Sequence, residues 1–302
     1  MAISRAQLAK ELEPGLNALF GLEYGRYENE HSEIFEEESS DRAFEEEVML
    51  GGFATAPVKS EGGAVSFDDA QETYTARYSH ETIALAFSIT EEAIEDNLYD
   101  RLASRYTKAL ARSMATTKQI KAASILNNAF STGANAIGDG AALCSSAHPS
   151  LSGNQRNLLS TAADLNETSL EQMLIDIAGF TDERGLKIAV RGTKLIIPKE
   201  LQFIAERVMN STLRSGTADN DNNAMKNMGM LPEGAVVNHF LTDTDAFFIK
   251  TDASNGFKYF NRAAIKTAME GDFDTGNMRF KARERYSFGV SDWRCVFGTP
   301  GA

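Results

Sequence analysis

The sequence has few residues that could form disulfides or metal sites. Among its 302 residues there are two cysteines, Cys144 and Cys295, and four histidines. Two thiols cannot form a disulfide framework, so we expect them to be small buried side chains in a reducing compartment. No cysteine–histidine cluster has the spacing of metal ligands. The sequence therefore predicts a fold without disulfides and without a bound metal.

Long apolar runs are also lacking. A helix that spans a bilayer needs about 18–20 apolar residues, and no run in the sequence approaches this length. The N-terminal segment MAISRAQLAKELEPGL lacks the apolar core and the small-residue cleavage site of a secretory signal. With 42% hydrophobic and 24% charged residues, the composition is typical of a soluble globular chain with no membrane contact.

Motifs for catalysis and for cofactors are missing as well. Ser145, Ser146 and His148 lie close together in a loop-like segment, but neighbours in one loop rarely reach triad geometry, and no GxSxG turn surrounds them. The segment GANAIGDGAA (133–142) lacks the Lys-Ser/Thr ending of a phosphate-binding loop and the spacing of GxGxxG. We therefore expect no catalytic residue and no cofactor, and a structural protein instead of an enzyme.

Charge is distributed unevenly along the chain. The net charge is −13, and the segment from Glu23 to Glu47 holds eleven acidic residues against two arginines. Near the C-terminus, by contrast, basic residues occupy alternate positions, so that in a strand all of them point to one side: Arg279, Lys281, Arg283 and Arg285. Three interpretations remain open for this strip, namely a solvated strand face, contact with acidic groups of a neighbouring subunit, and contact with nucleic acid.

Residues 51–89 predict a long projecting hairpin. Ser60-Glu61-Gly62-Gly63 is turn chemistry. From Thr73 onwards apolar residues alternate, with a phase change between Tyr78 and Ile83 that predicts a bulge or bend. A strand over residues 73–89 would be roughly 55 Å long. Such a segment should reach out as a two-stranded flap, and an isolated flap needs another surface to rest on.

A very long helix follows the hairpin. Thr90 is the expected N-cap, Gly133 the expected end, and the helix should be roughly 60 Å long. Its apolar stripe has i, i+4 spacing and consists of Ile94, Leu98, Leu102, Tyr106, Leu110, Met114, Ile120 and Ile125. Six basic residues along it exclude a membrane span, so we expect a spine that runs the length of a domain.

The remaining segments predict a compact α/β unit. A helix capped by Asn166 or Thr168, a strand at 195–197 followed by a helix from Pro198, and two strands within 235–252 are expected. The basic strand closes the chain.

This order of elements resembles the major capsid proteins of tailed phages, and in particular the Mu-type major head subunits, whose fold is shared with encapsulins. The resemblance covers nearly the whole chain. Its most specific pieces are VSFDDAQETYTARYSHETIALAFSITEEAIEDNLYD (65–100), SSAHPSLSGNQRNLLS (145–160), KLIIPKELQFIAERV (194–208), FLTDTDAFFIKTD (240–252) and KARERYSFGVSDWRCVFG (281–298).

The resemblance implies an α+β subunit with four parts. These are an N-terminal arm (1–49), an extended hairpin loop (50–89), a peripheral domain (90–160 and 261–302, with the spine helix at 90–131) and an axial domain (161–260). In such proteins the extended loop lies over a neighbouring subunit and the arm runs along another one. The expected subunit-interface residues are Arg279, Lys281, Arg283, Arg285, Glu36, Glu37, Glu38, Glu45, Glu46, Glu47, Lys59, Glu61, Tyr74, Arg77 and Tyr78.

The implied function is that of a major capsid protein. Hexamers and pentamers of the chain would form an icosahedral shell around double-stranded DNA, without sequence-specific binding, in a virion assembled in the host cytoplasm. A separate scaffolding protein, a portal and a decoration protein are the expected partners. The alternatives are an encapsulin-like compartment shell and an unrecognised hydrolase.

Overall fold

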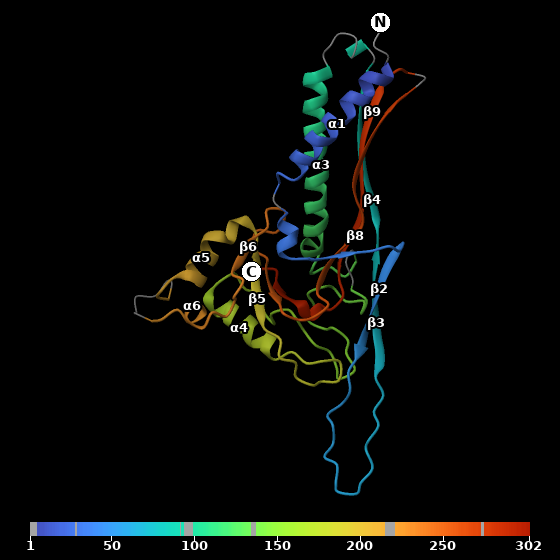
Figure 1. The fold of residues 1–302 in the computed structure, drawn as a ribbon. Coiled ribbons are helices and arrows are strands. Elements are labelled where there is room, and N and C mark those ends of the chain that lie inside the picture. The colour runs from blue at the N-terminus through green and yellow to red at the C-terminus, as the bar shows by residue number, and fades with distance from the viewer. Residues whose placement is uncertain are drawn as a thin grey trace.

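The chain folds into an elongated molecule with two sheets. The computed structural model describes residues 5–27, 29–90, 92–93, 99–133, 137–214, 221–272 and 275–302. Within these ranges the strands form two four-stranded sheets and one two-stranded ribbon. One sheet and two long helices make the upper part in Figure 1, the second sheet lies below with shorter helices, and a loop projects from the lower end.

The first sheet has the strand order β1-β8-β9-β4. β9 pairs antiparallel with β8 and β4, and β1 pairs parallel with residues 258–261 of β8. The strands are β1 (Glu36–Ser39), β4 (Glu81–Ile89), β8 (Phe257–Gly271) and β9 (Met278–Val290). Along β9, buried Phe280 and Ala282 alternate with exposed Arg279, Lys281 and Arg283, which confirms that the basic residues share one side.

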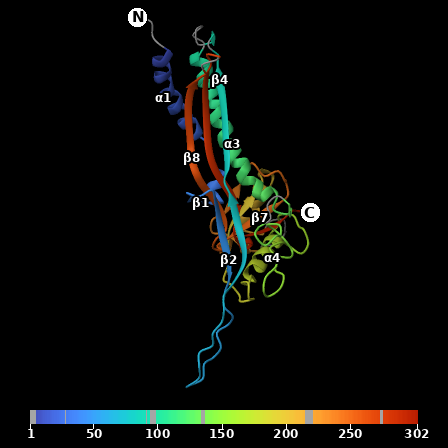
Figure 2. The same ribbon diagram turned by 90° about the vertical axis from the view of Figure 1, so that its right-hand side faces the viewer.

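Two helices cover one face of this sheet. They are α1 (Arg5–Tyr24) and α3 (Tyr99–Asn127); in Figure 1 α3 lies to the left of the sheet, and α1 runs obliquely across the upper end of the sheet and α3. Apolar side chains of both helices form a buried cluster with the sheet: Leu16, Phe20, Leu110, Met114, Ile89, Phe280 and Ala282. The opposite face of β4, β9 and β8 is turned towards the viewer in Figure 2, and no helix of the described ranges lies over it.

The spine helix agrees with its prediction only in part. Ile94 and Leu98 lie outside the described residues, as does the side chain of Leu102. α3 ends at Asn127, so Gly133 is not its cap. Tyr106 and Ile120 of the expected stripe are about half exposed, at 49% and 53%. The buried face consists largely of small residues, which let the helix approach the sheet closely: Ala103, Ala111, Ala122 and Ala123.

The second sheet has the order β10-β7-β5-β6 and holds the larger core. Its strands are β5 (Gly192–Ile197), β6 (Ala235–Val237), β7 (Phe247–Thr251) and β10 (Val296–Thr299). The helices beside it are α4 (Glu167–Ala178), α5 (Gln202–Asn210) and α6 (Ala224–Met228), and 3-10 turns lie at Glu30–Glu33, Lys199–Leu201 and Trp293–Cys295. Asn166 and Ser169 exchange side-chain and backbone hydrogen bonds as a capping box, so the expected start of α4 is confirmed.

The C-terminal strand lies elsewhere than the sequence suggested. We expected residues 261–302 to accompany the spine helix, and β8 and β9 do so. β10, however, pairs with β7 in the second sheet. Val296 and Phe297 are fully buried there, so the gain from burying their apolar side chains favours this position.

The predicted hairpin is correct in one half and wrong in the other. β2 (Phe44–Gly51) and β3 (Gln71–Ser79) form the two-stranded ribbon. The expected break falls at His80, between β3 and β4. β4 does not reach outward, because it pairs with β9 along its whole length. Only residues 52–70 project as a loop.

Candidate assembly surfaces

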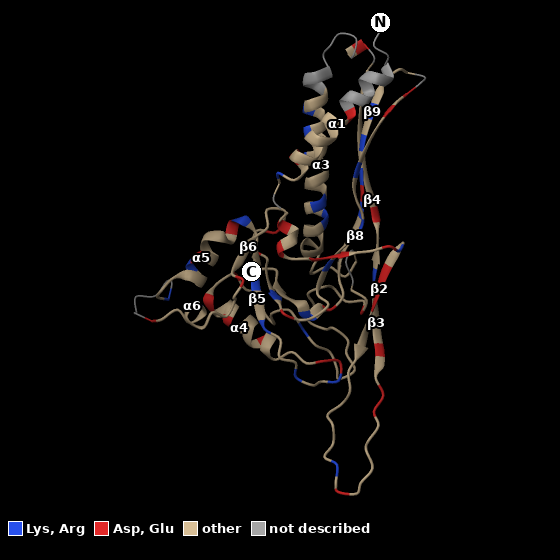
Figure 3. Cartoon of the chain, in the orientation of Figure 1, with Lys and Arg blue, Asp and Glu red and all other residues tan. Residues whose placement is uncertain are grey.

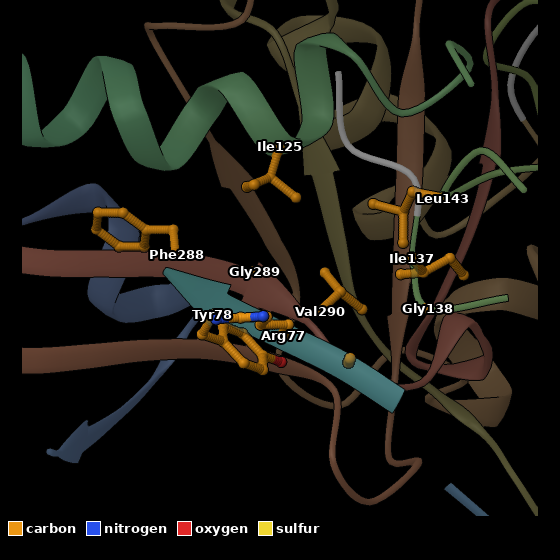
Figure 4. A pocket seen from close by; sticks show the side chains of 10 residues that line it. Arg77, Tyr78, Ile125, Ile137, Gly138, Leu143, Phe288, Gly289 and Val290 are labelled. Atoms are coloured by element: carbon orange, nitrogen blue, oxygen red, sulfur yellow. The ribbon is translucent and has the colours of Figure 1, made fainter. Parts of the chain in front are cut away.

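The base of the hairpin is fixed by two glycines of the body. A Cβ atom on Gly138 would lie 2.4 Å from the carbonyl oxygen of Thr75, and one on Gly289 would lie 2.6 Å from Cε1 of Tyr78. β3 can therefore cross β9 only because these side chains are absent. A cavity of about 180 Å³ remains beside the crossing, lined by both glycines together with Ile125, Leu143 and Val290 (Figure 4).

A polar network fastens the ribbon to the first sheet. Lys258 of β8 forms ion pairs with Glu47 of β2 and, at 3.0 Å, with Glu38 of β1. Burial alone would lower the pKa of Lys258, but its hydrogen bonds to the two carboxylates raise that pKa above its usual range. Ser291 donates to Glu47 and bonds the hydroxyl of Tyr78. The ribbon is thus held by paired charges as well as by packing.

His80 occupies the break between the ribbon and the sheet. Its Nε2 lies 2.9 Å from Oγ of Ser40, and its Nδ1 lies 2.9 Å from Oγ of Ser287. Burial, together with the positive charge of Arg285, lowers the pKa of His80. The neutral imidazole is therefore the form that fits this junction.

The projecting loop exposes large apolar side chains. Val58 is 100% exposed and Phe67 is 97% exposed, and Phe53 and Val65 are also exposed. Lys59 and Glu61 lie exposed in the same loop. One leg of the loop is tied to its own chain, because Arg184 pairs with Asp68 at 3.2 Å. Apolar groups presented in this way on a projection are typical of a contact with another molecule.

The uncovered face of the first sheet is basic. This face is formed by β4, β9 and β8. Residues that are paired across neighbouring strands point to the same side of the sheet, so the pairs show which residues share the face. The central row belongs to β9 and consists of Arg279, Lys281, Arg283 and half-buried Arg285. Small side chains flank it: Thr82, Ala84, Ala86 and Ser88 on β4, and Ala268 on β8. Lys266 and Glu270 of β8 complete the face, and Arg279 pairs with Asp272.

The acidic residues that we expected to meet this strip are partly engaged within their own chain. Glu38 and Glu47 hold Lys258, while Glu46 lies 3.7 Å from Arg77, whose guanidinium lies over the ring of Phe44. Glu45 accepts a hydrogen bond from Ser40. Glu36 and Glu37 are exposed.

The remaining predicted interface residues do not lie on this sheet face. Tyr78 is buried against its own body, and Tyr74 is half-buried beside Gly138. Lys59 and Glu61 lie in the projecting loop, far along the chain from the strip on β9. The chain thus brings the four basic residues together, but it does not bring the acidic blocks or the loop to them.

The serine–histidine segment builds structure, as expected for a loop. His148 is buried and stacked on Trp293, and its ring nitrogens contact Asp139 at 2.7 Å and Asn157 at 3.0 Å. Asn157 donates to three backbone carbonyls, those of Leu143, Trp293 and Val296. These bonds tie the loop to the C-terminal segment. Both cysteines are buried and free, and burial raises the pKa of each thiol.

The described ranges contain neither a membrane-spanning helix nor a cluster of metal-ligating side chains. None of their helices combines the length and apolarity that a bilayer span requires. No group of three or more His, Cys, Asp or Glu side chains in the described part of the chain is placed to hold a metal ion.

Sequence reasoning missed the residues that hold the hairpin in place. Gly289 interrupts the apolar pattern of β9, and an isolated glycine inside a strand indicates a close backbone approach. That signal was available in the sequence. The role of Lys258 had no such signal, because its two carboxylate partners lie more than 200 residues away in the chain.

Solved structures with a similar fold are shells of phages and related particles. The capsid of a native GTA particle has a TM-score of 0.55, 11% identity and 91% coverage of both chains. The capsid of Myoviridae phage XM1 has a TM-score of 0.52, 11% identity and 89% coverage of both chains. A virus-like particle from Pyrococcus furiosus has a TM-score of 0.51, 8% identity and coverage of 94% of this chain and 97% of the other.

At these identities the likeness concerns the fold, which is that of tailed-phage capsid structures. No curated protein sequence matches the chain. A family model described as phage capsid protein matches residues 73–298. This range includes most of β3, the spine helix α3, the basic strip and both sheets except for β1 and the last residue of β10. The chain therefore belongs to the phage capsid protein family.

Proposed function

We propose that this capsid protein builds an icosahedral shell in which residues 52–70 of each subunit lie on the uncovered sheet face of a neighbour. The observation that carries the proposal is that the subunit has two uncovered surfaces, one on the projecting loop and one on the first sheet. The loop exposes Val58 and Phe67 almost completely. The sheet face of β4, β9 and β8 is uncovered within the described chain. Within the described part of the chain, no element covers the apolar side chains of the loop or this face of the sheet.

Charge supports this assignment. The loop from Gly52 to Ala70 carries three acidic residues and one lysine. The sheet face carries five basic and two acidic residues, as described above. Opposite potentials set the register of an interface and exclude wrong partners, although single exposed pairs contribute only about 0–1 kcal/mol. Repeated at every subunit contact, such pairs would fix the position of the loop.

The acidic partner of the basic strip is thereby reassigned. The blocks Glu36–Glu38 and Glu45–Glu47 were the expected partner, but four of these carboxylates, those of Glu38, Glu45, Glu46 and Glu47, already pair with cations of their own chain. The loop acids Glu61 and Asp69 have no ion-pair partner among the described residues, so we assign the contact to them. Exposed Glu36 and Glu37 stay as secondary interface candidates.

The wider assignment follows from the family. The shell would consist of hexamers and pentamers enclosing double-stranded DNA, with a portal, a scaffolding protein and a decoration protein as partners, in a virion assembled in the host cytoplasm. The subunit acts mechanically and not as an enzyme. An encapsulin-like compartment is less well supported, because the matching family model is that of phage capsids.

The test separates assembly from folding. Lys281→Gln and Arg283→Gln together remove two exposed charges from the sheet face. We expect the double variant to keep its circular dichroism spectrum and its melting temperature but to form few closed shells by negative-stain microscopy. The control is Lys199→Gln, an exposed residue of the second sheet region, which should leave assembly unchanged. Normal shells from the double variant would refute the docking of the loop on this face.

A further inference from the structure

The spine helix is basic although the chain is acidic. Between Tyr99 and Asn127 there are six lysines and arginines and one acidic residue, Asp100. The whole chain has 43 acidic and 30 basic residues. Positive residues are therefore concentrated on one element, and Figure 3 shows them at intervals along α3. An excess of this kind on one helix indicates either internal ion pairs or an anionic partner.

Internal ion pairs account for two of the six. Lys118 lies 2.8 Å from buried Glu284, and Lys121 lies 2.7 Å from Glu81. The side chain of Arg101 is outside the described part. Three others are exposed, and within the described residues they make neither an ion pair nor a side-chain hydrogen bond: Arg105, Lys108 and Arg112.

These three charges form one line along the helix. Positions i, i+3 and i+7 lie on the same face, and they span roughly 10 Å of the helix axis. Next to this line the helix exposes the small residues Ala109 and Ser113. Tyr106 is 49% exposed, but its ring packs against Phe87 of β4. Such a line offers charges at regular intervals without the large apolar anchors that protein interfaces use.

The neighbouring helix does not neutralise this line. The exposed residues of α1 within 13–24 are uncharged: Pro14, Gly15, Ala18, Gly21 and Leu22. Glu23 is buried, and it pairs with Arg26. Both helices lie on the side of the sheet opposite the face that we assign to the neighbour's loop. Among the described side chains, this side of the molecule therefore presents three unpaired positive charges of α3 against one partly exposed carboxylate of α1, that of Glu13.

We propose that Arg105, Lys108 and Arg112 contact backbone phosphates of the enclosed nucleic acid, so that the helix side of the subunit faces the interior of the shell. This inference rests on the proposed function. The contact is independent of base sequence, because three charged side chains in one line can bind phosphates but present no array of groups for reading base edges. Its free energy comes from the release of counterions from the polyanion.

A nucleic acid is favoured over an acidic segment of another copy. The acidic block of the arm is largely engaged with Lys258 and Arg77, and the acids of the loop match the opposite face of the sheet. Long double-stranded DNA also presents charge continuously, so that every subunit of a shell meets phosphates whatever its orientation.

The experiment measures binding of a fluorescent duplex of about 30 base pairs and arbitrary sequence by anisotropy at about 50–200 mM salt. The variant is Arg105→Gln/Lys108→Gln/Arg112→Gln in the full chain, kept below its assembly concentration. The matched control is Lys281→Gln/Arg283→Gln, which removes charge from the opposite face. We expect the triple variant to bind at least about tenfold more weakly at the lowest salt, and its plot of log K against log salt to be less steep by roughly 2–3. The control should bind like the wild type.

Three results would overturn the proposal. The first is unchanged binding by the triple variant, and the second is an equal or larger loss in the control. The third is displacement of the wild-type protein from DNA by poly-glutamate at a lower charge concentration than unlabelled DNA needs, which would identify an acidic protein segment as the partner. If the triple variant unfolds, Arg112→Gln alone should still reduce the slope by about 1.

Negative-stain microscopy of the wild type separates this proposal from the proposed function. Absence of shells would contradict the shell assignment, whereas the anisotropy experiment concerns the subunit itself. The triple variant should form shells as the wild type does. Loss of the α3 charges should therefore weaken DNA binding only, and loss of Lys281 and Arg283 should reduce shell formation only.

Discussion

Gly138→Ala tests the crossing on which the position of the hairpin depends. The added Cβ would lie 2.4 Å from the carbonyl oxygen and 2.6 Å from the carbonyl carbon of Thr75, and 2.8 Å from Cδ2 of Tyr74. Contacts at optimal separation are about 3.5–4.0 Å, so β3 must move by on the order of 1 Å. Overpacking against backbone costs about 1–3 kcal/mol. At about 2.1 cal/mol/K per residue, this cost lowers the melting temperature of the 302-residue chain by roughly 2–5 °C.

Differential scanning calorimetry of the purified subunit measures this change. The matched control is Gly133→Ala, because a Cβ there meets nothing within 4 Å. We expect the control to stay within about 1 °C of the wild type. The Gly138 variant should also form fewer shells, because a displaced ribbon carries the loop away from its neighbour. Equal melting temperatures for the two variants would refute the view that glycine is required at the crossing.

Three further predictions concern the projecting loop, the break at His80 and the spine helix α3. Phe67→Ser should leave the melting temperature unchanged, since Phe67 is 97% exposed, and should reduce shell formation in microscopy; normal assembly would contradict the role of the loop. The lowered pKa of His80 means that the unfolded chain takes up this proton first, so the free energy of unfolding should fall as pH drops from about 7.5 to 5. In urea titrations the free energy of unfolding of His80→Asn should fall less over that pH range than that of the wild type. An equal fall would show that other groups cause the pH dependence. Lys118→Met leaves Glu284, whose side chain is 2% exposed, without its cation and should cost about 3–5 kcal/mol, whereas Lys121→Met removes an exposed pair and should cost under about 1 kcal/mol; similar costs would contradict the buried role of Lys118.

Local patterns in the sequence predicted much of the fold. The alternation of Arg279, Lys281 and Arg283 with apolar residues was enough to establish the two faces of β9, because strand geometry places alternate residues on opposite sides. Capping chemistry placed the start of α4 at Asn166 or Thr168, and the structure shows Asn166 as the cap. The phase change after Tyr78 predicted the break before β4. Each of these signals depends on residues close together in the chain.

The errors come from contacts between distant segments. β4 was assigned to the flap because its alternation is that of any strand, and only its pairing with β9 decides where it lies. The buried face of α3 was predicted only in part, because the prediction considered large apolar residues. Alanines form much of the face of α3 that is buried in the structure. The partners of Glu38 and Glu47 could not be anticipated, since Lys258 becomes their neighbour only after β8 has joined β1.

The predicted interface residues show the same division. The basic residues share one face of β9, as their alternation predicted, and four of the six acidic residues expected to meet them form ion pairs within their own chain. That these residues form a subunit interface stays a prediction. Exposure of Val58 and Phe67 in the loop could not be foreseen from an apolar count, because apolar residues in a hairpin are as often buried.

A cryo-electron microscopy reconstruction of particles assembled from the purified chain tests the central claim most directly. We predict a closed shell in which density for residues 52–70 of one subunit crosses the β4–β9–β8 face of the next, with Lys281 and Arg283 beneath it. A loop folded against its own subunit, or a sheet face left open to solvent in the closed shell, would contradict the account.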